Sequence, residues 1–93
     1  MKVRISMVTG QMQSASLKVI AIMKNENIFM NIEIKPSSNE LAAHTGEQIA
    51  RATAALFANE TDVSKMPLFS SFSTAALAAA YLTAPQIDRA ILY

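Results

Sequence analysis

One cluster of side chains, His44, Glu47 and Arg51, has residue types and spacing that could support catalysis or metal binding. Spacings of three and four residues place all three on one face of a helix, where a carboxylate could orient an imidazole. A metal site would lack ligands, because the chain has one histidine and no cysteine. No nucleophile or oxyanion-stabilising loop accompanies the cluster. We therefore interpret it as a solvated helix face with a Glu47–Arg51 ion pair, and we expect no metal and no cofactor.

Two serine pairs, Ser37-Ser38 and Ser70-Ser71, could place hydroxyl groups and unpaired amides at the starts of helices. Such groups suit an anion, so either pair could hold a nucleotide phosphate. A phosphate-binding loop, however, places glycines directly before a helix, and neither of the two glycines of this chain stands in that position. Ordinary helix capping therefore explains the serine pairs better than ligand binding does.

Basic residues are concentrated in the first 35 residues, which makes nucleic-acid binding a second hypothesis. On the predicted sheet they share an outer face with Phe29, and they are Lys2, Arg4, Lys18, Lys24 and Lys35. RNA-binding sheets stack bases on two or three aromatic rings rather than one. The net charge of only +1 also argues against a protein that holds nucleic acid by bulk charge.

The positions of these side chains depend on the predicted strands of the first third of the chain. Residues 2–9 and 28–35 alternate between apolar and polar types with a period of two, which is typical of half-buried strands. Residues 17–24 alternate in a similar way, and Asn25-Glu26-Asn27 has the composition of a hairpin turn. Pro36 cannot donate a ladder hydrogen bond and ends the third strand. The pattern predicts a three-stranded antiparallel β-meander over residues 1–36.

Residues 37–93 are predicted to be helical. Ser37 and Glu40 are spaced as a capping box for a helix that runs to about residue 58. A second helix, capped by Ser70 or Ser71, runs to about residue 83, and a short C-terminal helical turn follows in preference to a fourth strand. The complete prediction is one α+β domain over residues 1–93, with a β-meander followed by two α-helices and this helical turn.

Gly46 lies inside the first predicted helix, where a glycine costs about 0.5–1 kcal/mol relative to alanine. Either another backbone passes close to it, or the helix breaks there. We favour a continuous helix.

The composition predicts more apolar surface than a chain of 93 residues can bury. Hydrophobic residues make up 52% of the chain and charged residues only 16%, and the Ala-rich second helix has no polar side. Leaving such surface exposed to water forfeits several kcal/mol at roughly 25 cal/mol per Å². We therefore expect a homodimer or larger assembly, or a larger protein partner. The residues expected to form this interaction surface are Ile20, Ile22, Phe29, Leu77 and Tyr81.

The leading functional hypothesis is a non-enzymatic protein-interaction module that acts stoichiometrically by occupying a surface. Small chains without catalytic motifs are often inhibitors or accessory factors of phages and mobile elements, and we place this chain in that class. The third hypothesis is a small-ligand binder or enzyme that uses His44, Glu47 and Arg51 at a subunit interface.

A cytoplasmic location is expected, because the N-terminal residues lack the apolar run of a signal peptide. The uncharged stretch 66–87 is interrupted by prolines and hydroxyl residues, so we expect a buried helix there rather than a membrane span.

Overall fold

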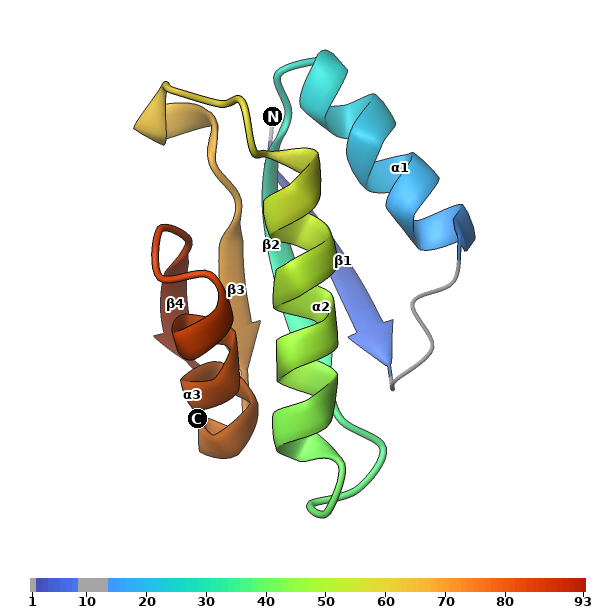
Figure 1. Cartoon of the computed structure of the whole chain (residues 1–93). Helices are drawn as coiled ribbons and strands as arrows, with labels where there is room; N and C mark the ends of the chain where they lie inside the picture. The colour runs from blue at the N-terminus through green and yellow to red at the C-terminus, as the bar shows by residue number, and fades with distance from the viewer. Residues whose placement is uncertain (1, 9–13) are drawn as a thin grey trace.

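The protein is an α/β domain in which strands and helices alternate along the chain. The computed structural model describes the backbone of residues 2–8 and 14–93 and the side chains of residues 4–6 and 18–93. Four strands form one sheet in the order β1-β2-β3-β4, and every neighbouring pair is parallel (Figure 1). The elements are β1 (Lys2–Val8), α1 (Ser14–Asn25), β2 (Phe29–Lys35), α2 (Ala42–Leu56), the 3-10 turn η1 (Val63–Lys65), β3 (Leu68–Ser71), α3 (Thr74–Thr83) and β4 (Asp88–Ile91).

The predicted antiparallel β-meander is wrong, because the segment expected to be its second strand is helix α1. Apolar side chains three residues apart also fit one face of a helix. Ile20 and Met23 have this spacing: Ile20 is fully buried, and Met23 packs against the core. The predicted hairpin turn is the end of this helix. Asn27 has the left-handed φ of 57°, and the N–H of Ile28 donates to the Met23 carbonyl at 3.0 Å. This is a Schellman-type helix end, which leads into a strand parallel to β1.

The prediction that residues 37–93 contain no strand is also wrong, because this half contributes the strands β3 and β4 in addition to helices α2 and α3. Both strands have only four residues, which is too short for a period of two to be recognised. The expected C-terminal helical turn is β4. Helix α3 starts later than predicted and is capped by Ser73, whose Oγ accepts from the Ala76 N–H at 3.1 Å.

Helix α2 confirms a helix in the predicted region, but the capping box of Ser37 and Glu40 does not form. The helix begins at Ala42, and its N-cap residue, Leu41, provides no side-chain hydrogen bond. Its buried face includes Thr45, Ile49 and Thr53, whereas Leu41 is 45% exposed.

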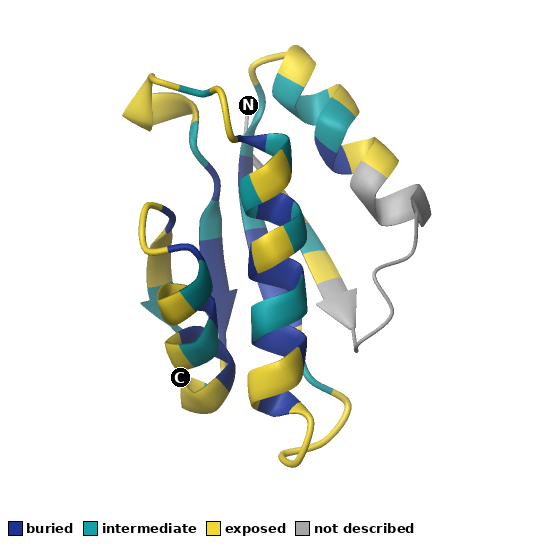
Figure 2. Ribbon diagram, in the orientation of Figure 1, coloured by how far each residue is buried: buried dark blue, intermediate teal, exposed yellow. Residues whose placement is uncertain are grey.

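All three helices lie on the same side of the sheet (Figure 1). This arrangement follows from the strand order. The connections between parallel strands are right-handed, so helices that link successive strands in one direction across the sheet all lie on the same face of the sheet. The core lies between the two layers, and buried residues are concentrated on β2, β3 and the inner side of α2 (Figure 2). Its largest fully buried apolar side chains are Phe69, Ile20, Met30, Ile32, Ile34, Ile49 and Ile87.

Gly46 is explained by the contact between α2 and α3. Helix α2 is continuous through this residue, and a Cβ atom at Gly46 would clash with the backbone of Ala76 in α3. The expectation of a continuous helix with a second backbone close to it is confirmed.

No helix in the described part of the chain is long and apolar enough to cross a membrane.

Candidate functional site

Within the described part of the chain, one face of the sheet carries no helix (Figure 1), and we call it the bare face. Ile32 and Phe69 point toward the helices and are fully buried, so the residues on either side of them in each strand point away. The parallel register aligns Arg4, Asn31, Leu68 and Asp88 in one row across the sheet. The described side chains of the bare face are Arg4, Ser6, Phe29, Asn31, Glu33, Lys35, Leu68, Ser70, Asp88 and Ala90.

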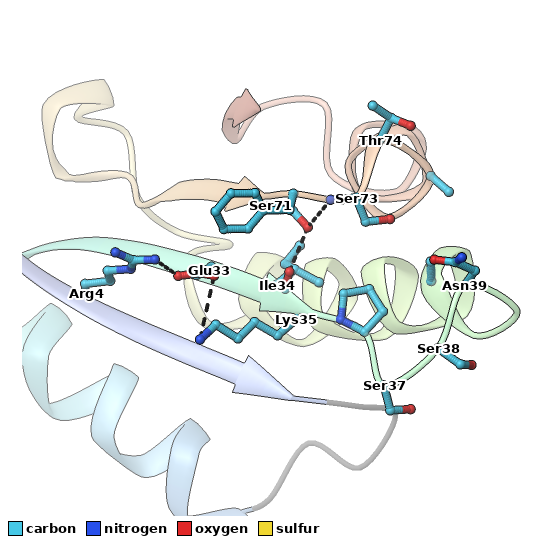
Figure 3. A pocket seen from close by; sticks show the side chains of 14 residues that line it. Arg4, Glu33, Ile34, Lys35, Ser37, Ser38, Asn39, Ser71, Ser73 and Thr74 are labelled. Atoms are coloured by element: carbon cyan, nitrogen blue, oxygen red, sulfur yellow. Dashed lines mark hydrogen bonds and ion pairs between the residues drawn. The ribbon is translucent and has the colours of Figure 1, made fainter. Parts of the chain in front are cut away.

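Glu33 is a buried carboxylate at the centre of the bare face. Its side chain is only 1% exposed, although none of the described helices lies on this face of the sheet. Arg4 donates to Oε1, and Lys35 Nζ lies 3.9 Å from Oε2 (Figure 3). A buried charge is tolerated only when it is paired, so these two cations stabilise the ionised form. Within the described part of the chain, however, Oε2 accepts no hydrogen bond.

A second polar contact joins neighbouring strands on this face. The Ser70 hydroxyl donates to Asn31 Oδ1 at 2.6 Å, and Ser70 is 1% exposed. Ser70 therefore belongs to the bare face rather than to a helix start, contrary to its predicted capping role.

A cavity of about 840 Å³ opens at the carboxyl ends of β2 and β3, between the starts of α2 and α3 (Figure 3). Arg4, Glu33 and Lys35 line it from the strands, and Phe72, 63% exposed, also lines it. Asn39 and the helix starts complete the lining. The carboxyl end of a parallel sheet is the edge at which α/β proteins bind ligands.

Three of the four predicted serines line this cavity, namely Ser37, Ser38 and Ser71. The Ser38 hydroxyl accepts from the Leu41 N–H at 3.3 Å. The Ser71 hydroxyl donates to the Ile34 carbonyl at 2.7 Å and accepts from the Ser73 N–H at 3.0 Å. Ser38 and Ser71 therefore hold the turns that lead into α2 and α3.

The predicted cluster of His44, Glu47 and Arg51 lies on α2 and does not line the cavity. The Glu47–Arg51 ion pair is confirmed, with Arg51 Nη2 2.6 Å from Glu47 Oε1. His44 is exposed. Among the described residues no group of three potential metal ligands is close together.

The five residues predicted as one interaction surface do not lie on one surface. Ile20 and Leu77 are buried in the core. Phe29 is half-buried on the bare face, whereas Ile22 is exposed on α1 and Tyr81 on α3. Ile20 and Ile22 do not lie on the sheet beside Phe29, because residues 17–24 form a helix rather than a strand.

The basic residues predicted to share one sheet face are likewise separated. Arg4 and Lys35 lie on the bare face, but Lys18 and Lys24 belong to α1. Lys24 Nζ lies 5.5 Å from the centre of the Phe57 ring, among the helices. Lys2 begins β1, and its side chain lies outside the described residues.

Glu33 is not among the site residues predicted from the sequence. The available signal was the alternation of residues 28–35, which puts Glu33 and Lys35 on the same face. The pairing with Arg4 could not be found in this way, because it depends on a parallel register.

The sequence matches no protein-family model and has no significant similarity to a curated protein. The chemistry of the bare face and of the cavity must therefore be inferred from their geometry.

Proposed function

We propose that the protein is a non-enzymatic interaction module that uses its bare face, and that the partner is a second copy of this chain. One observation carries the proposal: all the described helices lie on one of the two faces of an all-parallel sheet. Parallel sheets in globular proteins are almost always covered on both faces. A second layer of side chains, supplied by another copy, would complete the usual architecture.

The charges on the bare face support a symmetric pair. One row of the sheet runs from Arg4 on β1 to Asp88 on β4, so it has a cation at one edge and an anion at the other. A two-fold axis parallel to the strands places β1 of one copy opposite β4 of the other. Arg4 then faces the partner's Asp88 in two equivalent places, as an isologous interface requires.

The size of the face indicates that association is weak. Four strands spaced about 4.8 Å apart and up to seven residues long give a planar footprint of roughly 400 Å². The total buried surface is then near the lower limit of about 1,000 Å² for specific interfaces. The two peripheral ion pairs set the orientation more than the affinity. We therefore expect a concentration-dependent dimer.

The test is the oligomeric state of a variant with a charge on the bare face. Leu68 lies in the middle of the row and is only partly exposed, so Leu68→Glu would bury two uncompensated carboxylates in the dimer. The matched control is Leu82→Glu, the same change at a residue that is 82% exposed on α3, on the opposite side of the sheet. Sedimentation equilibrium over a wide concentration range is the measurement.

The proposal predicts dimers for the wild type and Leu82→Glu, and monomers for Leu68→Glu with an unchanged circular-dichroism spectrum. Monomers at every concentration for the wild type, or equal dimerisation of both variants, would contradict it. The cytoplasmic location and the assignment to inhibitors or accessory factors remain predictions.

A further inference from the structure

We infer that Phe29 is the anchor of self-association, and that each copy places its Phe29 ring in a pocket of the other copy at the amino ends of β2 and β3. The inference rests on the dimer proposed above and adds to it the residue and the pocket that give the interface its specificity. It depends on two features, an apolar pocket that borders the bare face and a strand register that brings the partner's Phe29 to this pocket.

The pocket has a volume of about 140 Å³ and lies at the amino-terminal edge of the sheet. Three of its lining residues, Phe29, Leu68 and Asp88, are the first residues of β2, β3 and β4. All three belong to the bare face, so the pocket borders the surface that the second copy would cover. Met66 and Pro67 add to the apolar lining.

Val63, on the 3-10 turn η1, is an exposed apolar residue in the wall of this pocket. Its side chain is 80% exposed. An apolar side chain that fills the pocket would contact Val63 and remove part of it from water, which favours association. The dimer therefore gives a partner to a residue that the single chain leaves exposed.

The register brings the partner's Phe29 to the pocket. Asn31 on β2 is paired with Leu68 on β3, so Phe29, two residues before Asn31, lies at the level of Met66. A two-fold axis parallel to the strands keeps the level of every residue and places β2 of one copy opposite β3 of the other. The partner's Phe29 then faces residues 66–68, which line the pocket.

The pocket suits a phenyl ring in size and in character. Apolar cavities of about 150 Å³ admit benzene. The Phe29 ring of the same copy forms one wall, and two aromatic rings attract each other in offset or edge-to-face contact. Aromatic side chains in well-packed pockets supply much of the binding energy of an interface. Such an anchor matters most where the interface is small, as it is here.

The polar part of the lining fits the same arrangement. Asp88 lines the pocket and is the residue that faces the partner's Arg4 in the proposed dimer. The ion pair would therefore lie beside the inserted ring. Contacts at the border of an anchor exclude water from it even when they contribute little affinity themselves.

The first experiment is sedimentation equilibrium of Phe29→Ala over a wide concentration range. Truncation of the anchor should raise the dimer dissociation constant by at least about 30-fold. The matched control is Tyr81→Ala, the loss of an aromatic side chain that is 45% exposed on α3, on the opposite side of the sheet, and it should leave the constant unchanged. Equal dimerisation of Phe29→Ala and wild type would overturn the inference and leave self-association intact. A wild type that is monomeric at every concentration would overturn both.

A second variant changes only an exposed residue, because Phe29 is half-buried and its loss can also weaken the fold. Val63→Glu puts a charge in the wall of the pocket and should weaken dimerisation by about tenfold or more, with an unchanged circular-dichroism spectrum. Leu82→Glu, the same charge at a site of similar exposure on α3, is its control. Equal dissociation constants for these two variants would contradict a pocket that the partner fills.

The contact itself can be observed by NMR in dimers that combine one isotope-labelled and one unlabelled chain. Isotope-filtered NOEs are expected between the Phe29 ring of one copy and the methyl group of the partner's Met66. A dimer whose Phe29 ring shows intermolecular NOEs only to residues outside the pocket would refute the assignment.

Discussion

Replacement of Gly46 by alanine tests the close packing of α2 on α3. In an unobstructed helix this change stabilises a protein by about 1 kcal/mol, because alanine loses less backbone entropy on folding. Here the new Cβ atom would lie 2.8 Å from the carbonyl carbon of Ala76 and 2.9 Å from its Cα, and closer still to its carbonyl oxygen. These are backbone atoms within a helix, so no flexible side chain can move aside.

The expected result is a net loss of stability. Overpacking of a well-packed interior costs about 1–3 kcal/mol, and the rigid backbone at Ala76 places this site at the upper end of that range. After subtraction of the propensity gain, Gly46→Ala should lower the free energy of unfolding by about 2 kcal/mol. For a domain of this size the corresponding fall in Tm is about 8–16 °C.

Thermal unfolding followed by circular dichroism measures this change. Ala43→Gly, at an exposed position of the same helix, is the control for backbone entropy alone and should cost about 0.5–1 kcal/mol. A rise in Tm for Gly46→Ala would refute the argument, because it would mean that the propensity gain is not opposed by a clash with α3.

Further predictions concern two hydrogen-bonded side chains. Ser71→Ala should lower the free energy of unfolding by about 1–3 kcal/mol in urea titrations, because Ser71 is fully buried and its hydroxyl serves both the Ile34 carbonyl and the Ser73 N–H; a loss below 0.5 kcal/mol would show that these bonds are dispensable. The hydroxyl and N–H of Ser64 lower the pKa of Asp62 below its ordinary value of 3.8. This interaction stabilises the fold above pH 3.8 and is lost as the pH falls through the lowered pKa. The Tm difference between wild type and Asp62→Asn should therefore shrink on acidification below pH 3.8, and a difference that stays constant would contradict the assignment.

The strands with clear alternation could be predicted from the sequence. The boundaries of β1 and β2 agree with the predicted segments to within one residue, and Pro36 follows directly after β2 as expected. The segment between them could not be assigned by periodicity. Its apolar residues satisfy a period of two as well as the spacing of a helix, and the burial of Ile20 beside the exposure of Ile22 decides for the helix.

That one segment determines the whole topology. A strand between β1 and β2 would make the sheet antiparallel, whereas a helix there makes a crossover and requires parallel strands. Because this segment is a helix instead of the predicted strand, Lys18 and Lys24 lie on a helix and not on the sheet, and the predicted basic sheet face does not exist. The cavity could not be predicted for a related reason: its two walls follow β2 and β3, and only the parallel register brings those strand ends to the same edge.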